Sequence, residues 1–275
     1  MNLHENYTRL KKEAYEGLQK RESSKNWIRM LEATPYLLGR EKGTLLLAVN
    51  TGMRILDDIA DGDRESPVGT SAVSYLEAKQ SFIRNPEIPH DDLDYLFLYC
   101  YELADKVGLS IGSELDAFFD YFLFDARRRN SGNIFSTQEL DQAYDSCDIT
   151  GSIRGSLMVF GDDPDKAQLL MPLGKAVRAF YTLRDYDPDI AAGFVNIPRE
   201  AIEQYEITPE DLPHRFSPSV RAWFHAEAAL GLQRINQHNI MMKSQKFRLR
   251  GKLVLPIAYI KPAKSCFEAV LADQQ

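Results

Sequence analysis

The sequence has few cysteines and no long hydrophobic run. Its three cysteines, Cys100, Cys147 and Cys266, are widely separated and odd in number, which fits neither a disulfide framework nor a CxxC metal site. No apolar run approaches the ~20 residues that a membrane-spanning helix needs, and the polar segment MNLHENYTRLKKE lacks the apolar core of a signal peptide. These absences predict a soluble, cytoplasmic protein in a reducing compartment.

An excess of positive charge is also missing. The 275 residues carry a formal net charge of -7, and the pI is about 5.4, which argues against nucleic acid as a partner. Hydrophobic residues make up 44% of the chain, enough for a large core. They recur at spacings of three and four, as in Tyr95, Leu96, Tyr99 and Leu103, while runs of alternating polarity are scarce. The pattern predicts one all-α domain over residues 1–275.

Several predicted helices have apolar and aromatic residues on more than one face. Examples are LDYLFLYCYELA and LDAFFDYFLF, a pattern typical of helices in the middle of a bundle. Their side chains either form the core or line a long apolar pocket.

A cluster of like charges follows the apolar run LLLAVNTGMR. The segment ILDDIADGD, residues 55–63, places four carboxylates within seven residues. In a helix, Asp57 and Asp61 lie one turn apart on the same face. Such a pair destabilises a helix by about 0.2–0.5 kcal/mol, and the helix dipole adds to the cost at a C-terminal end. The cluster is either a solvated helix end that Gly62 terminates, or it is compensated by Arg54 or by a divalent cation held by oxygen ligands.

A second acidic cluster occurs in LRDYDPDIAAGFVNIP, residues 183–198. Asp185, Asp187 and Asp189 again close a helix whose earlier part is apolar and basic. Pro188 disfavours helical geometry at Asp187, so we expect the helix to kink or end between Asp185 and Asp189. Two such clusters are expected to face each other across a bundle and to hold Mg²⁺, which shares its ligands between carboxylates and substrate phosphates. The predicted ligand is a diphosphate.

With both motifs in this order, the chain resembles the squalene/phytoene synthase family. ILDDIADGD resembles the first aspartate-rich motif of the family, and YTLRDYDPDIAAGFVNIP resembles the second. Weaker similarity over FSTQELDQAY, REAIEQYEITPEDL and FRLRGKLVLPIAYI extends the resemblance from about residue 36 to residue 262. It implies an all-α isoprenoid synthase bundle with a central apolar cavity.

The resemblance also implies an activity. The expected reaction is Mg²⁺-dependent transfer from allylic prenyl diphosphates, with Mn²⁺ as a substitute metal, most directly head-to-head condensation of two such substrates with release of diphosphate. The alternatives are transfer to another acceptor, cyclisation of a single prenyl diphosphate, or prenyl binding without catalysis. An NADPH-dependent second step and the oligomeric state are left open by the sequence. Peripheral membrane association would suit release of an apolar product.

The resemblance assigns roles to individual residues. The carboxylates that match the two motifs are predicted to bind metal and, apart from Asp58, to be catalytic: Asp57, Asp58, Asp61, Asp185 and Asp189. Two arginines beside the motifs, Arg54 and Arg184, are predicted to bind the diphosphate. Aromatic residues are candidates for contact with the prenyl chain or its cation, either in a pocket or in the core: Phe118, Phe119, Phe122, Phe180 and Tyr181.

Two positions depart from the family pattern. Arg178 and Tyr181 stand where the family has a glutamine and an asparagine upstream of the second motif, and both are kept as candidates for substrate binding. A tyrosine is not a ready Mg²⁺ ligand, so one metal site is expected to be rebuilt or absent.

The segment YDSCDITGSIRG, residues 144–155, departs as well. Asp145, Asp148 and Arg154 replace part of a small and apolar pattern. The polar residues indicate a narrower cavity or a polar co-substrate. Alternatively, the two aspartates pair with Arg127, Arg128 or Arg178 in a structural role.

Overall fold

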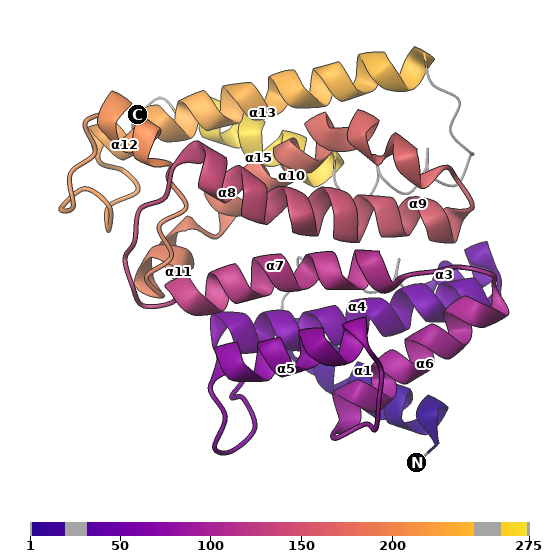
Figure 1. Cartoon of the computed structure of the whole chain (residues 1–275). Coiled ribbons are helices and arrows are strands. Elements are labelled where there is room, and N and C mark those ends of the chain that lie inside the picture. The colour runs from indigo at the N-terminus through magenta and orange to yellow at the C-terminus, as the bar shows by residue number, and fades with distance from the viewer. Residues whose placement is uncertain (1, 20–31, 245–259, 274–275) are drawn as a thin grey trace. The chain divides into compact units, whose positions relative to one another are not determined.

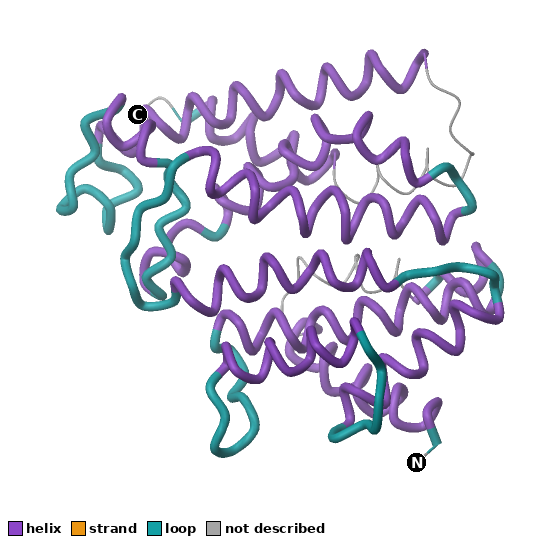
Figure 2. The backbone as a smooth tube through the Cα atoms, in the orientation of Figure 1, coloured by secondary structure: helices purple, strands orange, loops and turns teal. Residues whose placement is uncertain are grey.

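The computed structural model describes residues 2–19, 32–244 and 260–273, and the regular structure in these ranges is helical (Figure 2). The all-α prediction is thus confirmed for the described residues. The chain divides into two compact units. Unit 1 comprises residues 1–126 and 155–161, and unit 2 comprises residues 127–154 and 162–275. The prediction of one domain over the whole chain stays a prediction.

Unit 1 is built around one long helix, α4 (Arg40–Asp61), on which the other helices pack. These are α1 (Leu3–Gln19), α3 (Thr34–Leu38), α5 (Ala72–Arg84), α6 (Asp92–Lys106) and α9 (Gly155–Phe160), while α7 (Gly112–Arg128) contributes residues up to Ala126 (Figure 1). Leu45, Ala48 and Leu56 of α4 are fully buried, as are Leu96 and Phe97 of α6. The apolar residues on several faces of these two helices therefore form core.

Unit 2 is organised around α10 (Met171–Arg184), which packs on α13 (Pro218–Ser244) and α15 (Lys261–Ala272). Its other elements are α8 (Thr137–Asp145), the π-helical segment η2 (Ser146–Arg154), the 3₁₀ helix η3 (Pro164–Leu170), α11 (Tyr186–Ala191) and α12 (Arg199–Gln204). The core of this unit includes Leu183, Trp223 and Phe267. It fixes the end of α10, after which the second acidic cluster begins at Asp185.

Gly231 allows α13 to approach α15 closely. A Cβ atom at this position would lie 2.4 Å from the ring of Phe267, which is fully buried and has little room to move. We therefore predict that Gly231→Ala lowers the free energy of unfolding by about 1–3 kcal/mol through overpacking, although alanine is the better helix former. Denaturant titration measures this change.

The matched control is Gly155→Ala at the start of α9, where the nearest atom to an added Cβ, in Glu114, is 3.7 Å away. That substitution should be neutral or stabilising by up to about 1 kcal/mol. Equal stability of the Gly231→Ala variant and the wild type would contradict the packing of α13 on α15.

His238 is buried in unit 2 with 1% of its surface exposed. Its Nδ1 atom has no hydrogen-bond partner among the described residues, and burial lowers the pKa of its imidazole. Since the folded-state pKa lies below the unfolded value of about 6.5, the unfolded state takes up the proton first as the pH falls. The stability that neutral His238 contributes is therefore fully present above the unfolded-state pKa of about 6.5, and it is lost as the pH falls through the folded-state pKa.

We predict that the free energy of unfolding decreases from about pH 7.5 to about pH 5.5, and that the decrease is smaller in His238→Gln. Urea titrations at the two pH values test this. His214→Gln, at an exposed position, should retain the wild-type dependence. A His238→Gln profile that matches the wild type would show that another group titrates.

Candidate functional site

The first acidic cluster lies on the last turn of α4. Arg54, one turn earlier, places its Nη1 atom 3.0 Å from Asp57 Oδ2 and also contacts Asp58 through Nη2. These three side chains are 20–27% exposed, so solvent and ligands can reach them. Arg54 thus compensates two of the carboxylates, which is one of the alternatives that the sequence left open.

Gly62 ends α4 as predicted. It has φ 79°, the left-handed conformation that glycine adopts without strain. The backbone N–H of Arg64 then donates to the carbonyl oxygen of Asp58 at 2.9 Å. The turn satisfies one of the carbonyl groups at the helix end and holds the last turn of α4, with its carboxylates, in place.

The second cluster begins at a break between two helices. Asp185 has φ −97° and ψ 12° and separates α10 from α11. Pro188 is the third residue of α11, where its missing N–H costs nothing because first-turn N–H groups have no partner within the helix. The predicted break exists, but it lies at Asp185. The expectation that Asp187 would be non-helical was wrong, since Asp187 belongs to α11.

Each carboxylate of the second cluster contacts a donor from unit 2. Arg184 donates with two nitrogen atoms to Asp185, with an Nε–Oδ1 distance of 2.8 Å. Arg215 Nη1 donates to Asp187 Oδ2 at 3.1 Å.

Asp189 is held by an asparagine that sequence reasoning missed. Asn196 Nδ2 donates to Asp189 Oδ2 at 2.8 Å, and Tyr144 in turn donates its hydroxyl to Asn196 Oδ1 at 2.8 Å. Asn196 is part of the motif quoted above, but nothing in its spacing indicates this contact. These two hydrogen bonds connect Tyr144 on α8 through Asn196 to Asp189 on α11, and they orient the Asp189 carboxylate.

Arg178 forms the ion pair that the sequence offered as one alternative. Its Nε and Nη2 atoms donate to the two oxygens of Asp148 at 2.9 and 2.8 Å, and its guanidinium lies 4.3 Å from the ring centroid of Tyr144. Asp148 belongs to η2, and π-helical turns occur often at functional sites. Asp145 lies 3.9 Å from Lys175, a partner that was not among the three arginines considered.

Tyr181 lies on α10 beside Phe180 and Arg184. The guanidinium of Arg184 lies 4.7 Å from its ring centroid and 5.2 Å from that of Phe180. Burial raises the pKa of Tyr181, so its hydroxyl stays neutral and offers no anionic oxygen to a metal. That one metal site is rebuilt or absent stays a prediction. A neutral tyrosine hydroxyl, which is a poor Mg²⁺ ligand, is consistent with it.

Three of the five candidate aromatic residues lie in unit 1. Phe118 and Phe122 stack on α7 with ring centroids 6.1 Å apart, and Phe122 meets Phe119 edge to face. Phe119 and Phe122 are buried and pack as core residues, whereas Phe118 is partly exposed. Contact of these rings with a prenyl chain stays a prediction, as does the central apolar cavity.

The carboxylates suit a hard cation such as Mg²⁺, but they do not form a complete metal cage. Within residues 2–19, 32–244 and 260–273, no group of three or more His, Cys, Asp or Glu side chains is arranged to hold a metal ion. Mg²⁺ typically takes one or two protein carboxylates and completes its shell with water and phosphate oxygens. Asp57 and Asp58 fit that use, and binding should then depend on a phosphate ligand. The prediction that the two clusters face each other stays a prediction.

No described helix is both long and apolar enough to span a membrane. The segment FRLRGKLVLPIAYI, residues 247–260, was predicted to resemble the family. All of it except residue 260 lies outside the described residues.

Comparisons with known proteins find likeness in structure and none in sequence. No family model and no curated protein sequence matches the chain. Squalene synthase HpnC from Alicyclobacillus acidocaldarius is similar with a TM-score of 0.66 and 16% identity, over 98% of this chain and 93% of that one. A dehydrosqualene synthase, solved in complex with a ligand, is similar with a TM-score of 0.63 and 14% identity, over 98% of both chains. The chain thus has the all-α isoprenoid synthase fold of these two enzymes.

Proposed function

We propose that the protein is a Mg²⁺-dependent prenyltransferase that acts on allylic prenyl diphosphates and joins two of them head to head with release of diphosphate. The observation that carries the proposal is the pair of helix-end carboxylate clusters, each in contact with an arginine from its own helix. Likeness to two synthases in fold supports it. A structural scaffold has no use for like charges in these positions, which counts against a non-catalytic prenyl-binding protein.

The carboxylates of the two clusters would hold the metal: Asp57, Asp58, Asp61, Asp185 and Asp189. When bound, Mg²⁺ or Mn²⁺ supplies Lewis-acid neutralisation of the departing diphosphate. Asn196 fixes one oxygen of Asp189 and so limits the orientations of that carboxylate. The protein contribution at this point is to present oxygens in fixed positions.

Arg54 and Arg184 would bind the diphosphate. A guanidinium has five N–H donors, and these two arginines use only part of them on their aspartates. The remaining donors can bind phosphate oxygens in the bidentate manner typical of arginine. Both groups then stabilise the charge that develops as the carbon–oxygen bond breaks.

The prenyl chains would be held by apolar and aromatic surfaces that exclude water. In the ionising step the diphosphate leaves with the electron pair of the carbon–oxygen bond. The alkene of the second substrate attacks the allylic cation, and loss of a proton closes a cyclopropane. Phe118, Phe122 and Tyr181 are the proposed ring contacts, since aromatic faces stabilise a nearby cation.

The ion pair between Arg178 and Asp148 favours a second candidate function. It places fixed charges in unit 2 at a position where the family pattern has an amide. A polar site of this kind suits ionisation of a single prenyl diphosphate followed by transfer to another acceptor, or by cyclisation. The ionising residues would be the same in both functions.

Product analysis by mass spectrometry tests the proposal. With Mg²⁺ and geranyl, farnesyl or geranylgeranyl diphosphate, we expect a hydrocarbon with twice the carbon number of one substrate. Asp57→Asn combined with Asp185→Asn should lower turnover by about 10²-fold or more, because fixed electrostatic stabilisation of the leaving group is lost. Asp105→Asn, at an exposed position on α6, is the matched control and should retain full activity.

The other outcomes separate the two candidate functions. Release of diphosphate with only a single-chain alcohol or cyclic hydrocarbon would support the second candidate and overturn condensation. No turnover of any of the three substrates by folded protein would contradict the head-to-head proposal.

A further inference from the structure

Unit 2 contains a small charged cavity among α8, η2, α10 and α13. Its volume is about 100 Å³. The lining includes the ionisable residues Asp141, Asp145, Asp148, Lys175, Arg178, Glu227 and Arg234. None of the five aspartates proposed to bind metal lines it. A cavity with this many charges is unsuited to a prenyl chain.

Two of the cations in the lining are neutralised by direct partners. Lys175 Nζ lies 2.7 Å from Asp141 Oδ2, and Arg178 binds Asp148 through two hydrogen bonds. These four groups cancel in formal charge.

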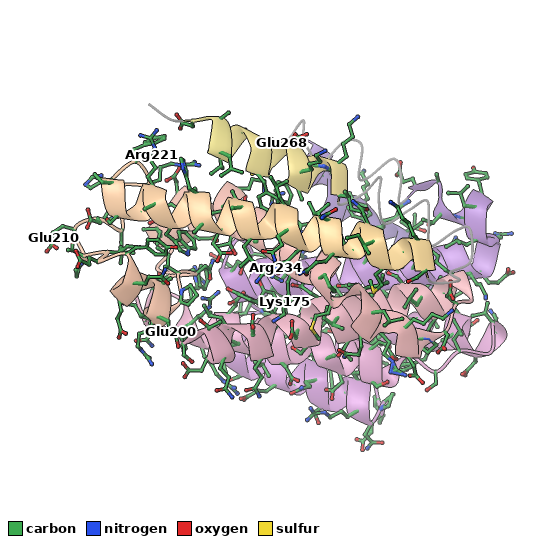
Figure 3. The ribbon with its side chains drawn as sticks, turned by 90° about the horizontal axis from the view of Figure 1, so that it is seen from above. Lys175, Glu200, Glu210, Arg221, Arg234 and Glu268 are labelled. Atoms are coloured by element: carbon green, nitrogen blue, oxygen red, sulfur yellow. The ribbon has the colours of Figure 1, made fainter. Side chains whose placement is uncertain are left out.

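The other acidic and basic groups in the lining are Asp145, Glu227 and Arg234. No close ion pair joins them to one another in the part of the chain that the structure describes. Asp145 is 3.9 Å from Lys175 Nζ, beyond hydrogen-bond distance, and Glu227 accepts no hydrogen bond from any residue the structure describes. Arg234 on α13 approaches Lys175 on α10 (Figure 3), but its Nη1 atom only donates to the Lys175 carbonyl at 3.5 Å. Two carboxylates against one guanidinium leave an excess of one negative charge.

Burial makes this excess costly. Desolvation raises the pKa of Glu227 and also that of Asp145, although the Asp145 side chain is still 34% exposed, so the charged form of each carboxylate is less favourable here than in open water. A positively charged ligand would remove the cost, because an opposite charge close to a carboxylate favours its ionised form.

Trp223 adds a second, independent requirement. Its side chain lines the cavity and is 2% exposed, and its indole N–H has no acceptor among the described residues. A buried donor without an acceptor is rare in folded proteins and calls for a ligand or water atom that accepts its hydrogen bond. A bare cation cannot do this, whereas a ligand with an oxygen atom can.

We propose that this cavity binds a small organic ammonium ion that also carries a hydroxyl group, that is, an amino alcohol. The ammonium would lie between Glu227 and Asp145, and the oxygen would accept from Trp223 or Arg234. A cavity of ~150 Å³ admits benzene with its six heavy atoms, so about four heavy atoms fit here, the size of ethanolamine. The inference does not rest on the proposed prenyl chemistry, because it uses different residues.

Tryptophan fluorescence with ethanolamine as the probe tests the proposal. The chain has two tryptophans, so Trp27→Phe leaves Trp223 as the single reporter. At about pH 8, where the amine is protonated, and at constant ionic strength, we expect a saturable change in Trp223 emission. Calorimetric titration of the wild type should give the same dissociation constant.

Variants and matched probes sharpen the test. Glu227→Gln should weaken binding by at least about tenfold, as expected when a charged hydrogen-bond partner is lost. Glu203→Gln on α12, at an exposed position, should bind as the wild type does. Ethylammonium, which lacks the acceptor, should bind more weakly than ethanolamine, and ethylene glycol, which lacks the charge, should show no saturable response.

Three results would overturn the proposal: no saturable response to ethanolamine, an equal response to ethylene glycol, or undiminished binding by Glu227→Gln. Circular dichroism establishes that each variant is folded. If Glu227→Gln does not fold, Asp145→Asn serves in its place with the same expected loss.

Discussion

The clustering of carboxylates at the end of α4 and at the break between α10 and α11 is the constraint on which the candidate site depends. Negative charge at the C-terminal end of α4 opposes the helix dipole, and neighbouring carboxylates repel one another. The chain meets this cost locally: Arg54 contacts Asp57 and Asp58, and Arg184 contacts Asp185. Each cluster is therefore in contact with an arginine guanidinium before any metal or substrate binds. If a metal takes the carboxylates, the same arginines can turn their donors to a diphosphate.

The parts of the site that could be predicted from the sequence are those determined within one helical turn. Gly62 and Arg54 were foreseen because both act on residues at most four positions away. A helix break near Pro188 was predicted, but the structure has it at Asp185. A proline is well tolerated in the first turn of a helix, and here this outweighs its tendency to keep the preceding residue, Asp187, out of helical geometry. The all-α class followed from apolar spacing alone.

Contacts between distant segments could not be predicted in the same way. Pairing of Asp148 with one of three arginines was one of two alternatives, and only the packing of η2 on α10 selects Arg178. Nothing in the sequence indicated roles for Asn196 and Glu227, because their contacts depend on segments that meet only in the folded unit. The polar residues of segment 144–155 thus have two structural consequences in unit 2, an ion pair with Arg178 and part of a charged cavity, and both distinguish this chain from the apolar pattern of the family it resembles.

Calorimetric titration of inorganic diphosphate, with and without Mg²⁺, tests the central claim most directly. The account predicts that the metal tightens diphosphate binding by about tenfold or more, within the usual range of coupling between two ligands, and that Asp57→Asn with Asp185→Asn removes this coupling. Asp105→Asn should leave it unchanged. Equal affinity for diphosphate with and without Mg²⁺, or coupling that survives loss of both aspartates, would contradict the account.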